Sequence, residues 1–164
     1  YTKDFIELLN DINISEGSQL HRLPILEPKK NDEHNLILGI FTDIGGKLVL
    51  VGRISLEDIN FVNQSAEFKI FIKPTLQKKG IGTASSIQVI EHGFEALNLH
   101  RIHCGTLYTN KGFKSLAIKL DMRSEGVRMD AVFKDGKFID IIEFGLLRSD
   151  YFATSEGKIK ENSK

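Results

Sequence analysis

Short apolar and β-branched runs follow one another after residue 35, and they predict three consecutive strands. The first two cover residues 36–41 and 48–56, and Gly45-Gly46 between them is typical of a hairpin turn. A polar connection then leads to a third strand over residues 66–72. Because short connections join antiparallel neighbours, we expect the three strands to pair in that way.

The spacing of the apolar residues changes after residue 82. Large apolar side chains then recur at steps of three or four, which predicts one face of a helix over 83–97: Ile87, Ile90, Phe94 and Leu97. A further strand is predicted over 101–108. A strand, a crossover helix and another strand form a right-handed parallel unit in nearly all proteins. Strands 66–72 and 101–108 should therefore be parallel neighbours.

The same change of spacing recurs in the last third of the chain. An apolar stripe predicts a second helix over 111–120. Two strands, over 127–133 and 138–147, follow it, and Asp135-Gly136 between them is a strong hairpin signal. The pattern as a whole predicts a mixed sheet with helices packed on it.

The two ends of the chain are less regular. Residues 4–10 are predicted as a short helix, whereas the segment before residue 35 holds Pro24 and Pro28 and leaves a loop and a short helix after Pro28 as alternatives. Residues 153–164 are polar and charged, which predicts a flexible tail. We expect a single domain over 1–164, with an N-terminal helical and loop segment at 1–35 and a core at 36–152.

Composition narrows the classes of protein. The chain has 22 Lys and Arg against 22 Asp and Glu, and this balance argues against a general nucleic-acid binder. No apolar run approaches the length of a membrane-spanning helix, so no membrane partner is expected. Cys104 is the only cysteine, which rules out a disulfide within the chain and favours a cytoplasmic location. The histidines show no metal-ligand spacing, and we expect no metal site.

One loop carries the clearest chemistry. The stretch Gln77-Lys78-Lys79-Gly80-Ile81-Gly82-Thr83 lies between a predicted strand and a predicted helix. Glycine lets the backbone approach another group closely, and a helix start offers free N–H groups and the positive end of the helix dipole. Together they favour a phosphate site. Lys78 or Lys79 is a candidate for a point charge on a cofactor phosphate.

The order of elements around this loop resembles the GCN5-related N-acetyltransferase (GNAT) superfamily. The family's pyrophosphate signature is Gln or Arg, two variable residues, Gly, any residue, and Gly or Ala; it reads here Gln77-Lys78-Lys79-Gly80-Ile81-Gly82. Ala66-Glu67, with the strand up to Lys73-Pro74, looks like the strand before the signature, and Asn110-Lys111 stands where the family has an asparagine at a strand end. Residues 130–151 resemble the branch that includes ribosomal-protein N-terminal alanine acetyltransferases.

The resemblance implies an α+β fold: a mixed, mostly antiparallel sheet with a central splayed parallel strand pair and helices on both faces. It also implies direct transfer of an acetyl group from acetyl-CoA, the co-substrate, to a primary amine. In the family the pantetheine arm pairs with strand backbone, the loop N–H groups hold the pyrophosphate, and the asparagine bonds near the pantetheine amide. The cofactor-binding residues that this implies here are Phe71, Ile72, Gln77, Lys78, Lys79, Gly80, Ile81, Gly82, Thr83 and Asn110.

Glu67 is the candidate catalytic base, because a carboxylate in a partly closed cleft can take up the proton of the attacking amine. An exposed cross-strand ion pair, and a contact to the acceptor's ammonium group without removal of its proton, are its other interpretations. Phe113 and Ala117 stand where many members have a serine or a tyrosine that protonates the leaving thiolate. Ser115 lies about 200° around the helix from Phe113, so it is not an obvious substitute.

Asp121-Met122 is a further departure, since the family usually has Gly-Phe after this helix. A protein N-terminus is the first acceptor that we expect from the resemblance, and a polyamine or an aminoglycoside comes next. An acyl-CoA sensor without turnover is the alternative from another class, and a glycine loop that is only a turn is the third. A homodimer is a candidate assembly.

Overall fold

The structure, a computed structural model, describes residues 25–28 and 33–161, with side chains over 33–154. The helix predicted over 4–10 lies outside these residues. In chain order the described elements are β1 (Ile25–Pro28), β2 (Leu36–Ile44), β3 (Lys47–Asn60), β4 (Ser65–Ile72), η1 (Pro74–Leu76), α2 (Ile81–Glu95), β5 (Arg101–Leu107), α3 (Lys111–Lys119), β6 (Arg123–Lys134), β7 (Lys137–Leu147) and α4 (Arg148–Glu161).

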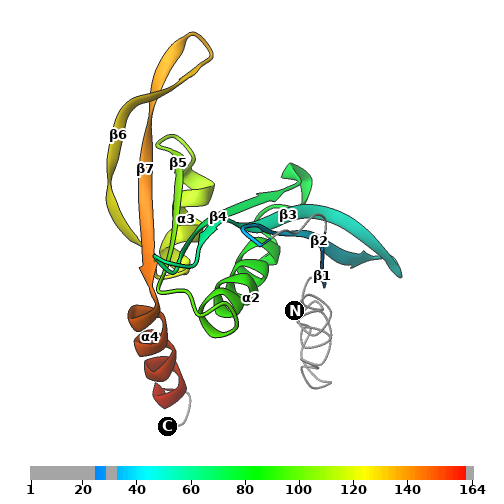
Figure 1. Ribbon diagram of the computed structural model, residues 1–164. Coiled ribbons are helices and arrows are strands. Elements are labelled where there is room, and N and C mark those ends of the chain that lie inside the picture. Colours follow the sequence, from blue (N-terminus) through cyan, green and yellow to red (C-terminus); the bar gives the residue numbers. More distant parts are fainter. Residues whose placement is uncertain (1–24, 29–32, 162–164) are drawn as a thin grey trace.

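The described strands form one sheet in the order β1-β2-β3-β4-β5-β7-β6 (Figure 1). All neighbours are antiparallel except β4 and β5, which run parallel. Because α2 is the crossover between β4 and β5, the predicted parallel unit is confirmed. The expected α+β architecture, a mixed and mostly antiparallel sheet with a central parallel pair, is confirmed as well.

The parallel pair is short, and this opens the sheet. Its register joins three residue pairs only: Ser65 with Arg101, Ala66 with Ile102, and Glu67 with His103. β4 continues to Ile72 and β5 to Leu107, but in the described residues the two strands no longer pair with each other there. The strands are thus splayed, and the edge of β4 that faces β5 lacks a neighbouring strand after Glu67.

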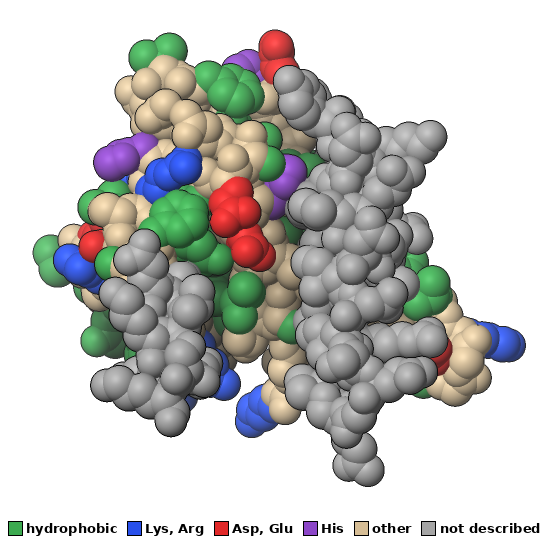
Figure 2. All heavy atoms as spheres, turned by 90° about the horizontal axis from the view of Figure 1, so that it is seen from below, with side chains coloured by type: hydrophobic (Ala, Val, Ile, Leu, Met, Phe, Trp, Pro, Cys, Tyr) green, Lys and Arg blue, Asp and Glu red, His purple; other side chains and the backbone are tan. Residues whose placement is uncertain are grey.

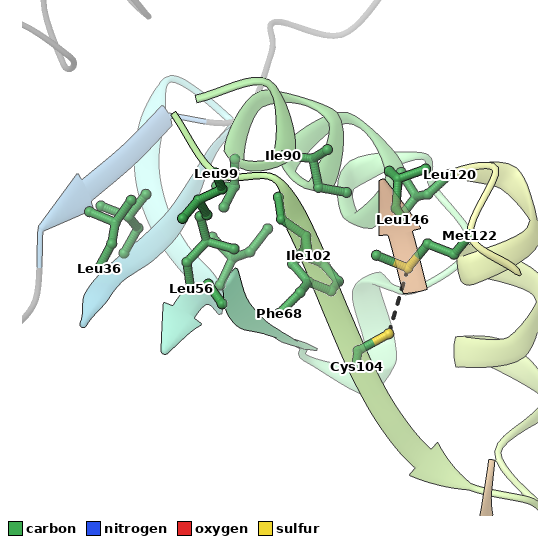
Figure 3. Packing of buried hydrophobic residues seen from close by; sticks show 14 of the residues in the cluster. Leu36, Leu56, Phe68, Ile90, Leu99, Ile102, Cys104, Leu120, Met122 and Leu146 are labelled. Atoms are coloured by element: carbon green, nitrogen blue, oxygen red, sulfur yellow. Dashed lines mark hydrogen bonds between the residues drawn. The ribbon is translucent and has the colours of Figure 1, made fainter. Parts of the chain in front are cut away.

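The main core lies between this sheet and two helices. Gly93 of α2 sits so close to the sheet that a Cβ there would be 2.9 Å from Ile102 Cδ1 and 3.0 Å from Leu56 Cδ1. Phe113 of α3 packs on the same face, with its ring 6.3 Å from that of Phe68. Figure 3 shows side chains from β3, β4, β5 and α2 converging in this layer. We expected helices on both faces of the sheet. Both α2 and α3 pack on the face that carries Phe68 and Ile102.

Two segments differ from the prediction. β1 is a strand inside the segment that we expected to be helix or loop, and it pairs antiparallel with β2. It is the edge strand of the sheet, where a proline such as Pro28 is tolerated. α4 is helical through Glu161, where we expected a tail from residue 153. Arg148 at its start donates to the Phe94 carbonyl at 2.6 Å and to Asn98 Oδ1 at 2.7 Å, contacts that the local composition does not reveal.

The hairpin of β6 and β7 is longer than predicted and projects from the body of the sheet (Figure 1). β7 pairs with β5 only as far as the pair of Ile141 and Leu107. Beyond that point the Tyr108 N–H still donates to the Asp140 carbonyl at 2.9 Å. We call residues 128–140 the arm, because they extend past the end of β5 as a two-stranded ribbon.

Candidate cofactor cleft and active site

The glycine loop turns the chain from β4 into α2. Gln77 donates from Nε2 to the Ile72 carbonyl at 2.9 Å, which ties the loop to the strand end. Gly80 is the N-cap of α2 with φ 81°, a left-handed conformation that favours glycine. The cap makes no side-chain hydrogen bond. The first N–H groups of α2 therefore keep the capacity to bind an anion.

A cleft of about 510 Å³ lies beside this loop, which is within the usual range for small-molecule sites. Three segments line it: the end of β4, the glycine loop with the start of α2, and α3. These are the elements on the two sides of the gap between the splayed strands. The lining residues are Ile70, Phe71, Ile72, Gln77, Lys78, Gly80, Gly82, Thr83, Asn110, Gly112, Phe113, Ser115, Leu116 and Lys119.

Most of the cofactor residues expected from sequence lie together in this cleft. They are Phe71, Ile72, Gln77, Lys78, Gly80, Gly82, Thr83 and Asn110. Lys79 and Ile81 are not among the lining residues, and neither is Glu67. Lys78 is in the left-handed region with φ 60°, which sets its direction apart from that of Lys79. Of the two candidate lysines, the cleft geometry therefore favours Lys78.

One wall of the cleft was not anticipated. Gly112, Ser115, Leu116 and Lys119 of α3 line it, although only Asn110 was proposed from that region. These residues are three or four positions apart, so the sequence indicated that their side chains share one face of the helix. It did not tell which face of α3 turns to the cleft. Ser115 reaches the cleft although it lies well around the helix from Phe113.

Asn110 has two interactions at the start of α3. Its Oδ1 accepts from the Phe113 N–H at 3.1 Å, which caps the helix. Its Nδ2 donates to Thr106 Oγ1 at 3.1 Å and so ties the cap to β5. Asn110 thus caps α3, and these bonds fix its side chain at the edge of the cleft. Contact with a cofactor stays a prediction.

Glu67 is the last paired residue before β4 and β5 separate. Its Oε2 is 2.9 Å from the ammonium of Lys69, and its side chain is 30% exposed. Lys69 also lies 2.9 Å from Glu57 Oε2 on the neighbouring strand β3. Glu67 therefore forms an ion pair, but with a residue of its own strand β4 rather than the cross-strand pair expected. The pair leaves the carboxylate partly accessible at the point where the sheet opens, which is compatible with contact to an acceptor amine.

Hydrogen bonds and ion pairs hold Glu57, the second carboxylate that Lys69 contacts. Ser55 Oγ donates to Glu57 Oε1 at 2.8 Å, and Arg53 pairs with the same oxygen. Burial opposes ionisation of Glu57, but the hydrogen bonds from Lys69 and Ser55 and the nearby positive charges outweigh it and lower its pKa. Hydrogen bonds to Glu57 and then Glu67 raise the pKa of Lys69. Glu57 and Lys69 therefore carry opposite charges at neutral pH.

The departures from the family pattern have structural explanations. Phe113 packs on Phe68 in the core and also lines the cleft, and Ala117 is fully buried. Asp121 adopts φ 58°, so it takes the left-handed turn that a glycine would otherwise provide. Met122 is buried with its Sδ 3.6 Å from Cys104 Sγ (Figure 3). Neither Phe113 nor Ala117 can donate a proton.

Cys104 is a core residue of β5. It has no exposed surface, and burial followed by the charges of Glu143, Glu67 and Glu125 raises its pKa to about 12. Such a thiol stays protonated at neutral pH and is a poor nucleophile. Within the described part of the chain there is no group of His, Cys, Asp and Glu that could hold a metal. Among the same residues, no helix is long and apolar enough to cross a membrane.

A mixed sheet that opens at its parallel pair, beside a glycine-rich helix start, is the architecture that the acetyltransferase resemblance implies. A sequence profile described as "Acetyltransferase (GNAT) domain" matches residues 16–123. The match covers more than half of the chain, so the chain belongs to the GNAT family.

Two relatives and one solved structure are representative. The spermidine N(1)-acetyltransferase of Vibrio cholerae is 31% identical over 107 residues, which cover 65% of this chain and 62% of the relative. The enzyme of that name from Escherichia coli K12 is 30% identical over 102 residues, covering 62% and 55%. The crystal structure of the Vibrio cholerae spermidine N-acetyltransferase with CoA and spermine has a TM-score of 0.68 at 26% identity, covering 73% of this chain and 69% of that one.

The matched region is only part of these relatives. The chain spans about three fifths of the length of the curated relatives that it matches.

Proposed function

We propose that this chain is an N-acetyltransferase that moves an acetyl group from acetyl-CoA to a primary amine. The observation that carries the proposal is the cleft, which joins the gap between the splayed strands to the glycine loop and the start of α2. Family membership supports it. When acetyl-CoA is bound, a C–N bond to the amine forms, the C–S bond breaks, the amine loses a proton and the thiolate gains one.

The residues of the cleft have distinct proposed roles toward the donor. Free N–H groups at the start of α2 would hold the pyrophosphate, because Gly80 and Gly82 leave room for close approach. Lys78 would add a point charge to a phosphate group. The unpaired edge of β4 near Phe71 and Ile72 would form backbone hydrogen bonds with the extended pantetheine arm, as it would with a neighbouring strand.

On the acceptor side Glu67 is the residue that we propose for contact with the amine. It marks the end of the paired region, and its carboxylate is partly exposed and held by Lys69. It would orient the ammonium group and take up its proton, directly or through a water molecule.

The acceptor that we propose is a polyamine. The names of the two relatives and the presence of spermine in the solved structure support this class. A protein N-terminus, our first expectation, remains the second candidate, because the hairpin resemblance over 130–151 favours it. An acyl-CoA sensor is the outcome if no amine is acetylated.

A thiol-release assay tests the proposal. Wild-type protein, acetyl-CoA and either spermidine or a short peptide with a free N-terminus are combined, and released CoA thiol is measured. We expect release with spermidine and at least tenfold less after Glu67→Gln, with Glu95→Gln on the exposed surface of α2 as the matched control. Acetyl-CoA binding without release for any amine would support the sensor instead. An unchanged pH profile in Glu67→Gln would remove Glu67 as the base.

A further inference from the structure

Positive charge gathers in the two segments that flank the cleft. Residues 73–83 lead from β4 through the glycine loop into α2, and residues 108–119 contain α3. Together they hold no Asp or Glu but six lysines: Lys73, Lys78, Lys79, Lys111, Lys114 and Lys119. On the face seen from below, by contrast, the visible Lys and Arg side chains are scattered among acidic and apolar ones (Figure 2). The zero net charge of the chain therefore conceals a strongly basic cleft entrance.

Four of these lysines lie outside the cleft itself. Lys78 and Lys119 line it, whereas each of the other four is next in sequence to a residue that does. We call these four the basic rim: Lys73, Lys79, Lys111 and Lys114. In the described part of the chain none of them pairs with a carboxylate, although Arg53, Arg101 and Arg128 each do. The charge of the basic rim is therefore available to a partner.

An exposed apolar side chain lies within this charged surface. Ile118 is 68% exposed, and it follows Lys114 by four residues and Lys111 by seven, so the three side chains share one face of α3. The Lys114 ammonium lies 4.4 Å from the centroid of the Tyr108 ring, which holds it on this side of the helix. An apolar residue surrounded by charged ones is typical of a protein interface, with its apolar centre and polar edge.

We propose that the basic rim and Ile118 dock an acidic carrier protein, which brings an acyl group into the cleft on a pantetheine arm. This inference rests on the proposed function, because the transfer to an amine is the same and only the donor differs. A partner on this surface surrounds the cleft entrance, so it must fill the cleft with a group of its own. A pantetheine arm attached to a protein through a phosphate meets this need, because the glycine loop would hold the phosphate.

Charge and apolar surface together favour this class of partner. Nucleic acid is the other strongly anionic candidate, but a phosphate backbone makes no use of Ile118 and brings no thioester to the cleft. Acidic residues on a carrier protein complement the lysines, and steering by opposite charge speeds association. Ile118 does not line the cleft, so free acetyl-CoA has no need of it. Ile118 therefore distinguishes the two donors.

Transfer from a carrier needs no further reactant. The amine nitrogen attacks the thioester carbonyl, a C–N bond forms and the C–S bond to the carrier's pantetheine breaks. The thiolate gains a proton in exchange for the one that the amine loses, and the carrier leaves with a free thiol. The residues proposed above for the pantetheine arm, the phosphate and the amine keep their roles.

Paired donor assays with the full chain test the inference. The donor is either acetyl-CoA or an acyl carrier protein with an acetyl group on its pantetheine arm, and spermidine and the short peptide are both supplied as acceptors. Mass spectrometry measures the acetylated amine, and we expect transfer from both donors. Ile118→Ala should lower kcat/KM about tenfold for the carrier and leave it unchanged for acetyl-CoA.

Matched variants control for general effects. Val62→Ala should affect neither donor, since Val62 is 93% exposed in the β3–β4 turn, away from α3. Lys111→Gln should act as Ile118→Ala does, whereas Lys137→Gln removes an equally exposed lysine of the arm and should have no effect. Circular dichroism checks that each variant is folded.

The outcomes separate this inference from the proposed function. Acetylation with acetyl-CoA but none with the carrier would overturn the docking surface and leave the N-acetyltransferase in place, whereas acetylation with neither donor would overturn both. Equal losses for the two donors in Ile118→Ala would show that this face of α3 serves the cleft alone, which also refutes docking. Binding of a short RNA that depends on Lys111, without transfer from the carrier, would assign the basic rim to nucleic acid instead.

Discussion

Lys69 is the residue that connects the candidate acceptor side to the body of the sheet. Its ammonium lies between Glu57 and Glu67, at 2.9 Å from a carboxylate oxygen of each. Glu57 is itself held by Ser55 and Arg53, so it acts as a fixed anchor. Glu67, by contrast, has Lys69 as its ion-pair partner in the described residues. The position of the Glu67 carboxylate therefore depends on Lys69.

Replacing Lys69 should affect turnover more than donor binding. In Lys69→Met the Glu67 carboxylate loses its partner and its fixed position, and we expect kcat in the proposed reaction to fall about 10- to 100-fold. The affinity for acetyl-CoA should stay unchanged, because Lys69 does not line the cleft. Steady-state kinetics and calorimetric titration measure the two effects. Lys69→Arg, which keeps the charge, should recover part of kcat; equal loss in both variants would mean that Lys69 does not position Glu67.

A residue's role could be predicted from sequence where the residues that define it are neighbours in the chain. The loop from Gln77 to Thr83 could be predicted, because glycine spacing and a helix start are contiguous in sequence. The network around Lys69 could not, since Glu57 arrives from β3 through strand register. Asp121 is a similar case. Its left-handed conformation replaces a turn glycine; aspartate tolerates that conformation better than most residues, but this preference alone does not identify a turn.

At the scale of elements, α2 contains a partly buried histidine, His92. Burial lowers the pKa of His92, near the end of α2, to about 4 from 6.5. In the unfolded chain His92 therefore binds a proton as pH falls through 6.5, whereas in the folded protein its imidazole stays neutral down to about pH 4. Stability that is fully present above pH 6.5 is lost progressively between these values.

We expect the free energy of unfolding to drop by about 1 kcal/mol from pH 7 to pH 5 on account of His92, after allowance for its partial exposure. Urea denaturation at the two pH values measures this. In His92→Gln the difference between pH 7 and pH 5 should shrink by that amount. The same slope in variant and wild type would assign the pH dependence to other groups.

Gly52 determines how closely β3 approaches the end of β4. A Cβ at this position would be 2.8 Å from Ile72 Cδ1 and closer still to the Phe71 carbonyl oxygen, which is backbone and cannot move aside alone. Gly52→Ala should cost about 1–3 kcal/mol of stability. It should also weaken acetyl-CoA binding, because Phe71 and Ile72 line the cleft.

Thermal unfolding and calorimetric titration check both effects. Gly112→Ala is the stability control, since its Cβ would meet only Asn110 Oδ1, at 3.7 Å. A Gly52→Ala protein as stable as wild type would show that the strand end is free to shift.

Elements with strong periodic patterns were predictable, and those held by distant contacts were not. β2 to β5, α2 and α3 follow from apolar spacing and turn residues. α4 depends on Arg148 bonding to Phe94 and on Tyr151, whose ring lies 5.3 Å from that of Phe94. β1 depends on pairing with β2. These partners are far apart in sequence, so local composition predicted a tail and a loop instead.

At the scale of the whole molecule, the cleft divides the sheet. Binding of acetyl-CoA should stabilise the native state by about 2.7 kcal/mol when its concentration is 100 times the dissociation constant. It should also protect from hydrogen exchange those backbone N–H groups of residues 68–72 that point into the gap rather than toward β3. Thermal shift and exchange mass spectrometry measure both. A shift without protection of this strand would place the donor elsewhere.

The short parallel pairing has a consequence for cooperativity. One half of the sheet, β1 to β4, joins the other half, β5 to β7, through three residue pairs, and α2 contacts β3, β4 and β5 across the junction. The helix thus couples two units that share little backbone hydrogen bonding. Phe94 is fully buried in α2. Phe94→Ala should therefore convert a single unfolding transition into two, which differential scanning calorimetry would record as two peaks. A single peak in this variant would show that the two halves of the sheet unfold together without the contacts of Phe94.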